Sequence, residues 1–273
     1  MKHEWSDIRL LSFLARYLFA FFSCVYVFTI GLFSARNREL INTICRHSGR
    51  KFSALLSLYD PILPAIELSQ VAGETGPIRI LEAPVRDGNM PHLELLAVNS
   101  LVAYHQPAAI FEIGTFDGRT ALNMAANSPP GSVVYTLDLP LAGINYTALP
   151  MDAFDRAYVD KKSSGARIAG HDCAAKITQL SGDSATFDFS SYFGKMQFVL
   201  VDGSHTYGYA MNDSAIARRL IGENRGVILW HDYGNCEGVT RALNQLHASE
   251  EFWRGIRGIK GTSLACLVVG QCA

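Results

Sequence analysis

The hydrophobic positions of the 273-residue chain change their spacing near residue 108. From there on, short continuous apolar runs alternate with stretches whose apolar residues recur every three to four positions, which is typical of helices with one buried face. The runs predict strands within 108–115, 132–140, 175–184, 195–205 and 226–234, and two more within 253–270; helices are predicted at 119–127, 207–222 and 239–248. Buried strands that alternate with helices indicate an α/β protein with a doubly wound, mostly parallel sheet of seven strands.

The stretch ahead of residue 108 predicts a helical extension. Residues 91–107 carry apolar residues at helical spacing, so we expect a helix that starts at Pro91 and stops at Pro107. Residues 77–84 (PIRILEAP) predict a short strand, and residues 38–60 predict broken helical segments. The chain is therefore expected to hold three regions: a hydrophobic helix within 1–36, a helical extension at 37–104 and the α/β domain at 105–273.

An uncharged run of 19 residues extends from Tyr17 to Ala35. As one helix it would be about 28 Å long, close to the hydrocarbon thickness of a bilayer. More Lys and Arg residues follow the run than precede it, which would keep the C-terminal region on the cytoplasmic side of a membrane. The alternative is a helix that packs internally or pairs two copies of the chain, and homo-oligomerisation is left open.

Charge and cysteine content exclude two classes of protein. The formal net charge of -1 and a pI near 6.7 provide no basic surface for nucleic acid, so we expect no nucleic-acid partner. The six cysteines form no CxxC pair and show no zinc-ligand spacing, which favours a reducing, cytoplasmic compartment over a disulfide framework.

Polar clusters follow five of the predicted strands, and in a parallel sheet these strand ends share the edge where ligands bind. Gly114 lets the backbone turn sharply beside a ligand, and Gly118 allows close packing where the next helix begins. Asp138 is placed to accept the hydroxyls of a ribose, and Asp183 is positioned for an adenine amino group. The order of the clusters predicts one nucleoside site; they are Glu112–Thr120, Leu137–Pro140, Ser181–Ser184, Val201–Tyr207 and Trp230–Tyr233.

These clusters resemble the motifs of the class I methyltransferases, and in particular the branch of macrocin O-methyltransferase-like enzymes. FEIGTFDGRTALNMAANSPPGSVVYTLDLP (111–140) is similar to the first two motifs of that branch. VDGSHTYGYAMND (201–213) and ILWHDYG (228–234) are similar to the fourth and fifth, and GTSLACLVV (261–269) to the last strand. The resemblance covers roughly residues 80–273 and implies the class I methyltransferase fold with S-adenosylmethionine as cofactor.

The resemblance also implies roles for individual residues. The turn from Glu112 to Gly118 would hold the methionine part of the cofactor, Asp138 the ribose, and Asp183 with Ser184 the adenine, while Asp202 would lie beside the methyl group. The expected cofactor site comprises Glu112, Gly114, Thr115, Phe116, Asp117, Gly118, Thr120, Asp138, Leu139, Asp183, Ser184, Asp202 and Gly203.

Methyl transfer to an oxygen requires a group that removes the proton of the acceptor hydroxyl. His205 and His231 are the candidate bases because histidine titrates near neutral pH, and Asp202 completes the expected catalytic set. Some relatives hold a divalent cation between carboxylates at these strand ends. Magnesium bound by Asp202 and Asp232 is therefore a second way to acidify the hydroxyl.

The expected acceptor is a hydroxyl on a sugar or another small metabolite, with the irregular stretch 142–172 as its wall or lid. An NAD-dependent oxidoreductase is one alternative, although the turn lacks the G-x-G-x-x-G spacing and Asp117 would repel a diphosphate. A hydroxylase-like relative of the same fold is a second alternative. A membrane-tethered, non-catalytic module that binds nucleosides is a third.

Overall fold

The structure is a computed structural model that describes residues 2–34, 37, 60–159, 164–223 and 225–270. The chain divides into two compact units, Met1–Leu56 and Ser57–Ala273. The larger unit therefore begins well before residue 105, because helix α3 (His92–His105) packs on α4 (Arg119–Asn127) and contributes to the core of the sheet. The broken helices predicted within 38–60 lie outside the described residues, apart from Asp60.

The first unit contains helix α1 (Lys2–Phe28), followed by the 3₁₀ turn η1 (Ile30–Phe33). The uncharged run holds the last part of α1 and then η1, so it does not form one continuous helix. The helix begins far upstream of Tyr17 and ends at Phe28, where the hydroxyl of Thr29 donates to the carbonyl of Val25. In the part of the chain that the structure describes, no helix has both the length and the apolar character needed to cross a membrane.

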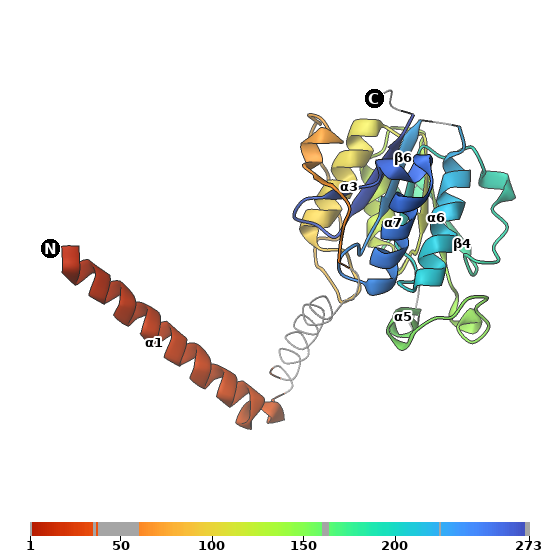
Figure 1. Ribbon diagram of the computed structural model, residues 1–273. Coiled ribbons are helices and arrows are strands. Elements are labelled where there is room, and N and C mark those ends of the chain that lie inside the picture. Colours follow the sequence, from red (N-terminus) through yellow and green to blue (C-terminus); the bar gives the residue numbers. More distant parts are fainter. Residues whose placement is uncertain (1, 35–36, 38–59, 160–163, 224, 271–273) are drawn as a thin grey trace. The chain divides into compact units, whose positions relative to one another are not determined.

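The second unit is built on one sheet of eight strands in the order β1-β7-β8-β6-β5-β2-β3-β4, with β8 alone antiparallel to its neighbours. Figure 1 labels β6 and β4 of this sheet. The predicted doubly wound, mostly parallel α/β fold is thus confirmed. The strands are β1 (Ala65–Ile66), β2 (Ala109–Ile113), β3 (Val133–Asp138), β4 (Ile177–Ser181), β5 (Phe198–Val201), β6 (Gly226–Trp230), β7 (Arg257–Ile259) and β8 (Ala265–Val269).

Two predictions about strands need correction. The sheet has an eighth strand, because Ala65 and Ile66 pair in parallel with β7 at its edge. The strand predicted at 77–84 does not form. The backbone N–H groups of Arg79 and Leu81 donate to the side chains of Asn127 and Asn123 on α4. This segment therefore forms its hydrogen bonds with a helix, and not with a neighbouring strand.

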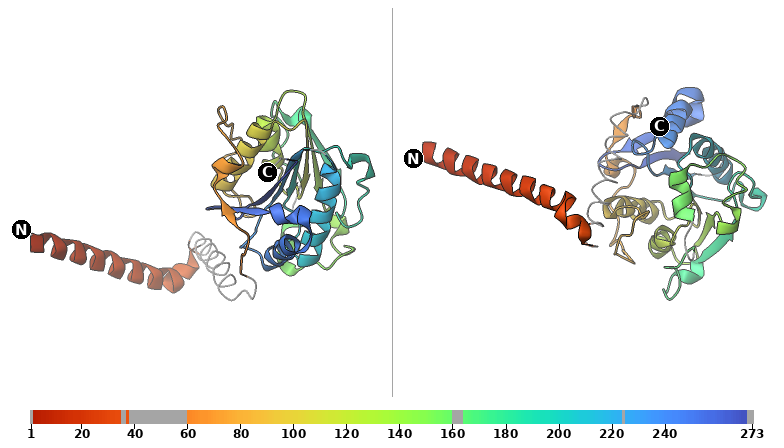
Figure 2. Two further views of the ribbon diagram at one scale, coloured as in Figure 1. Left: turned by 45° about the horizontal axis from the view of Figure 1, so that its top comes forward. Right: turned by 90° about the horizontal axis from the view of Figure 1, so that it is seen from below.

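Helices cover both faces of the sheet, as two further views also show (Figure 2). The core between α3, α4 and the sheet includes Leu101 and Leu122, and the core beneath α6 (Tyr207–Ile221) and α7 (Glu237–Ser249) includes Leu220 and Leu243. The remaining helical segments are short: η2 (Leu68–Gln70), η3 (Leu141–Gly143), α5 (Ala153–Val159), η4 (Ala174–Lys176), η5 (Ser190–Tyr192) and η6 (Glu251–Gly255).

The sheet order creates one crevice. The chain runs from β2 outward to β3 and β4, then returns to the other side of β2 to form β5 and β6. The loops after β2 and β5 therefore leave the sheet in opposite directions, and ligands of doubly wound folds bind at this reversal.

Candidate active site

The turn after β2 is pressed against the loop after β5. Gly114 has a φ of 106°, and a Cβ atom there would lie 2.0 Å from the carbonyl oxygen of Asp202. Any residue other than glycine is excluded at position 114, because the backbone conformation disfavours a side chain and the carbonyl of Asp202 occupies the place of its Cβ. Gly114 thus brings the first and fourth predicted clusters together.

A group of carboxylates surrounds this turn. Glu112 is fully buried, and its Oε2 accepts a hydrogen bond of 2.5 Å from Thr136, while its Oε1 has no hydrogen-bond partner among the described residues. Burial raises the pKa of Glu112 well above its usual range, and the negative charges of Asp202, Asp138 and Asp117 raise it further. The buried carboxyl group of Glu112 therefore favours its protonated form.

Asp117 and Asp138 are each held by residues distant in sequence. Asp117 lies 2.9 Å from Nε of the buried Arg167 and accepts the backbone N–H of Arg119 at the start of α4. Asp138 accepts a hydrogen bond from the hydroxyl of Ser164, which belongs to the irregular stretch after β3.

The other residues expected around the methionine part lie on the same turn or beside it. The hydroxyl of Thr115 is buried, 2.7 Å from that of Thr136, and Phe116 takes a left-handed φ of 48°. A Cβ on Gly118 would lie 2.6 Å from the side chain of Ile168, which agrees with the close packing expected there. Thr120 on α4 and Leu139 after β3 are half-buried.

Asp183 has a role that the sequence did not indicate. Its Oδ2 accepts the backbone N–H of Ala148, and its Oδ1 accepts the N–H of Ala185 and the hydroxyl of Tyr209. The carboxylate of Asp183 therefore links the irregular stretch, through Ala148, to Tyr209 on α6 and to the loop after β4. The contact of Asp183 and Ser184 with an adenine stays a prediction.

The loop after β5 places His205 between two carboxylates. Its Nδ1 lies 2.5 Å from Asp155 on α5, and its Nε2 lies 2.9 Å from Asp232 after β6. Asp155 also accepts the backbone N–H of His205 and the hydroxyl of Ser204. The predicted wall or lid at 142–172 thus contributes a carboxylate to the site.

His231 is held in the same way from the other side. Its Nε2 lies 2.8 Å from Glu94 on α3, and its Nδ1 lies 3.0 Å from Asp202 and 2.9 Å from Asp232. Glu94 is fixed in turn by the N–H and the hydroxyl of Ser263. Asp232 therefore accepts from both histidines at one oxygen.

The assignment of His205 or His231 as the base stays a prediction, and the contacts of both rings bear on it. Burial alone would lower the pKa of His205, but its hydrogen bonds to Asp155 and Asp232 outweigh burial and raise the pKa to about 10. Asp232 and Asp202 likewise raise the pKa of His231 well above its usual range. An imidazole whose two nitrogens both donate to carboxylates has no lone pair for an acceptor proton.

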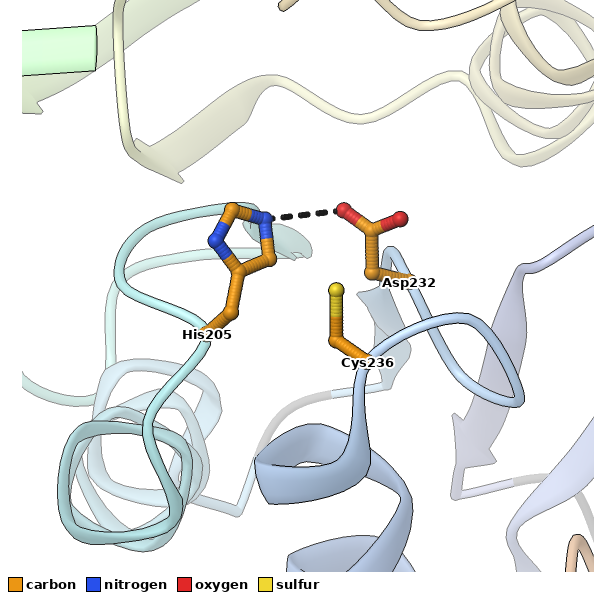
Figure 3. A group of neighbouring side chains, drawn as sticks. All are labelled: His205, Asp232 and Cys236. Atoms are coloured by element: carbon orange, nitrogen blue, oxygen red, sulfur yellow. Dashed lines mark hydrogen bonds and ion pairs between the residues drawn. The ribbon is translucent and has the colours of Figure 1, made fainter. Parts of the chain in front are cut away.

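Cys236 adds a sulfur atom to the cluster. It lies at the N-terminus of α7, and Figure 3 shows its thiol beside Asp232 and across from His205. One potential ligand atom from each of these three residues lies within 4.8 Å of the others, and the same holds for Asp202, His231 and Asp232. Close packing produces this arrangement, since a Cβ on Gly238 would lie 2.3 Å from the carbonyl oxygen of His205.

The residues present do not fit the expected magnesium ion. Magnesium requires oxygen ligands in near-octahedral geometry. Here the imidazoles of His205 and His231 contact the carboxylates that would bind it, and a thiol lies beside them.

The sequence missed Glu94, Asp155 and Cys236. Glu94 interrupts the apolar pattern of α3 and is nevertheless buried, and such a charge requires a partner. Asp155 and Cys236 had no comparable signal, because their importance depends on contacts with residues 50 and about 30 positions away.

Comparison with known proteins shows a family resemblance for one part of the chain. Residues 111–233 match a family model described as "Methyltransferase domain". The predicted enzyme class, a methyltransferase, is confirmed. No curated protein matches the sequence.

Several solved structures resemble the chain at low sequence identity. The S-adenosylhomocysteine-bound methyltransferase PaMTH1 of Podospora anserina is 16% identical, with a TM-score of 0.48, over 68% of this chain and 81% of that one. The O-methyltransferase TomG of Streptomyces achromogenes is 18% identical, with a TM-score of 0.46, over 81% and 95%. An O-methyltransferase of Bacillus cereus is 14% identical, with a TM-score of 0.42, over 67% and 84%.

Proposed function

We propose that the protein transfers the methyl group of S-adenosylmethionine to a hydroxyl oxygen of a sugar or another small metabolite, as in the macrocin O-methyltransferase-like branch. The observation that carries the proposal is the group of carboxyl groups around the turn after β2, among which the fully buried Glu112 has a strongly raised pKa. S-adenosylmethionine brings a sulfonium and an ammonium group, whereas a nicotinamide dinucleotide brings an anionic diphosphate. A cation bound beside Asp138 and Asp202 would also favour the ionised form of Glu112, whereas an anionic diphosphate would be repelled there.

The residues around the turn fit the cofactor. The unpartnered Oε1 of Glu112 is a buried acceptor that requires a donor, and a bound cation close to it would favour the ionised carboxylate. Asp138 is the proposed ligand of the ribose, in place of or together with the hydroxyl of Ser164. When bound, S-adenosylmethionine supplies the methyl group and leaves as S-adenosylhomocysteine.

Asp202 is the residue that we propose receives the acceptor proton. It lies at the end of β5 next to the turn, and its side chain is 20% exposed, compared with 4% for Asp155 and 9% for Glu94. His231 contacts one oxygen of Asp202 and orients the carboxylate toward the crevice. His205 and His231 then act as positioning residues, because their ring nitrogens already face carboxylates.

Membrane attachment through residues 17–35 stays a separate proposal, supported by the uncharged run and by the cations that follow it. The full-length chain should then sediment with membranes and resist extraction by high salt. If all of the protein stays in the supernatant when membranes are sedimented without added salt, the proposal of membrane attachment is contradicted.

A methyl-transfer assay tests the proposed function. The purified chain is incubated with methyl-labelled S-adenosylmethionine and fractionated extract of the source cells, and labelled products are identified by mass. We expect a labelled methyl ether that Asp202→Asn fails to form. Cofactor binding with no labelled product in any fraction would favour the non-catalytic alternative, and an oxygenated product the hydroxylase-like one.

A further inference from the structure

We propose that the methyl acceptor is a phenol, whose aromatic ring packs against the side chains of Phe116, Tyr158 and Phe154. This inference rests on the proposed function and narrows its acceptor from sugars and small metabolites in general to one chemical class. The three side chains, which we call the aromatic row, come from the turn after β2 and from α5.

The aromatic row extends from the expected cofactor turn to the loop after β5. The ring centroids of Phe116 and Tyr158 are 6.0 Å apart, and those of Tyr158 and Phe154 are 5.0 Å apart. Phe154 in turn lies 5.5 Å from the ring of His205. All three pairs meet edge to face, a geometry in which aromatic rings attract one another. The row therefore borders the place where the turn presses on Asp202, the proposed acceptor of the proton.

The rings are held in position by the protein itself. Phe154 and Tyr158 lie four residues apart on α5, so their side chains are neighbours on one side of the helix. A Cβ on Gly88, ahead of α3, would lie 2.8 Å from Tyr158 and 3.0 Å from Phe116. Phe116 also has a left-handed φ of 48°, a conformation that is characteristic of functional sites when the residue is not glycine. Phe154 nevertheless remains 42% exposed, and a ring packed on it would bury apolar surface.

The polar groups around Phe154 favour an aromatic ring over a sugar. Asp155 accepts from Nδ1 and the backbone N–H of His205 and from the hydroxyl of Ser204. The hydroxyl of Thr206 donates to a backbone carbonyl of the same irregular stretch. A sugar brings several hydroxyls that lose water on binding, and each one left unpaired costs affinity. An aromatic ring requires no such partners and adds to the edge-to-face contacts of the row.

The acidity of the acceptor hydroxyl points to the same class. The residues beside Asp202 do not fit magnesium, so a carboxylate has to take the proton without an ion that acidifies the hydroxyl. The pKa of a phenol is about 10, as in tyrosine, whereas aliphatic hydroxyls are closer to water, whose pKa is about 15.7. A phenol is therefore the acceptor that a carboxylate base deprotonates most readily.

The proposed step balances without a further reactant. The phenol oxygen gives its proton to Asp202 and forms a bond to the methyl carbon, while the bond between that carbon and the sulfonium sulfur breaks. The products are an aryl methyl ether and S-adenosylhomocysteine, and Asp202 then releases the proton to solvent.

The position of the transferred methyl group tests the inference. The full-length chain is incubated with methyl-labelled S-adenosylmethionine and fractionated cell extract, and the labelled oxygen is located by mass fragmentation. We expect an aryl methyl ether. A label on a sugar or another aliphatic oxygen would overturn the inference and leave the proposed function standing. Binding of S-adenosylmethionine without any labelled product would remove both.

The aromatic row is tested with 2-naphthol as the probe. Phe154→Ala should raise the KM for 2-naphthol about tenfold and leave the affinity for S-adenosylmethionine unchanged, whereas Phe154→Tyr should retain the wild-type KM. The matched control is Tyr104→Ala, which removes a ring of similar exposure, 45%, at the end of α3 that leads into the start of β2. Equal KM values for Phe154→Ala and Tyr104→Ala would overturn the role of the row.

A pair of probes provides a readout on the unaltered chain, which holds even if Phe154→Ala fails to fold. Decahydro-2-naphthol has the carbon skeleton of 2-naphthol but neither its aromatic rings nor its acidic hydroxyl. We expect methylation of 2-naphthol alone. Turnover of decahydro-2-naphthol at an equal or higher rate would refute the choice of a phenol, since methyl transfer would then need neither property.

Discussion

The carboxylate of Asp155 accepts two hydrogen bonds from His205, one from its backbone N–H at 2.9 Å and one from its Nδ1 at 2.5 Å. Asp155 is only 5% exposed although it lies on the short helix α5 of an otherwise irregular stretch. Asp155 therefore fixes His205 from the stretch between β3 and β4, which also contacts the site through Ser164 and Arg167.

Replacing Asp155 should disturb the site more than the fold. Asp155→Asn keeps the volume but removes the charge that orients His205, so we expect kcat of methyl transfer to fall roughly tenfold or more, which corresponds to the loss of about 1.5 kcal/mol from one charge-assisted hydrogen bond. The affinity for S-adenosylmethionine should change little. Asp172→Asn, in an exposed ion pair with Arg79, serves as the control in steady-state kinetics, and equal kcat values for the two variants would contradict the assigned role.

The contact between Gly114 and Asp202 predicts the effect of a single methyl group. Gly114→Ala places a Cβ at 2.0 Å from the carbonyl oxygen of Asp202, so the two loops must separate. We expect a loss of about 2 kcal/mol or more in the free energy of unfolding, as for overpacked sites, together with loss of cofactor binding. Gly76→Ala is the matched control because no atom lies within 4 Å of the added group. Urea denaturation of both variants measures the difference, and a Gly114→Ala protein as stable as Gly76→Ala would refute the close approach.

Glu112 should couple cofactor binding to pH. Its pKa lies well above the usual range in the free protein, and a bound cation favours the ionised form and lowers that pKa. Binding of S-adenosylmethionine therefore releases a proton, and affinity rises with pH until the pH exceeds the pKa of the free protein. Calorimetry in buffers of different ionisation enthalpy measures the released proton. Glu112→Gln should abolish the release, and an unchanged release in that variant would assign it to another group.

Asp213 predicts a pH dependence of stability. Burial raises its pKa from 3.8 to about 6, so the folded state disfavours the carboxylate. Its contribution is neutral below pH 3.8 and becomes destabilising as pH rises toward 6, reaching roughly 3 kcal/mol above that pH. Asp213→Asn should therefore unfold at higher urea concentration than the wild type at pH 8, with a smaller difference at pH 4.5. A difference that does not depend on pH would show that Asp213 does not titrate in this window.

Periodicity was sufficient to predict most of the fold and part of the site. The strands from β2 to β8 and the helices α3, α4, α6 and α7 follow from buried runs and helical spacing, because both patterns arise from contacts with one core. β1 contains two residues and forms through pairing with β7, which no local pattern indicates. Asp202, His205, His231 and Asp232 follow directly after strands, and the fold brings them together as expected.

The rest of the site depends on contacts between distant segments. Glu94 reaches His231 across 137 positions, and Asp155 reaches His205 from a stretch without clear periodicity. The sequence also did not indicate that both ring nitrogens of each histidine face carboxylates, which leaves neither nitrogen available to take a proton. Sequence spacing identifies which residues reach the edge of the sheet, but not which of them neutralise one another.

The most direct test of the account is a calorimetric titration of the purified full-length chain with S-adenosylmethionine and, separately, with NAD. We predict saturable micromolar binding of S-adenosylmethionine and no detectable binding of NAD. Asp138→Ala should weaken the affinity by about 1–3 kcal/mol, the cost of a lost charged hydrogen bond. Asp188→Asn, which alters an exposed carboxylate that accepts the N–H of Ser190, should not. Tight binding of NAD with none of S-adenosylmethionine would contradict the account, because it would mean that the carboxylates around Gly114 do not select a cation.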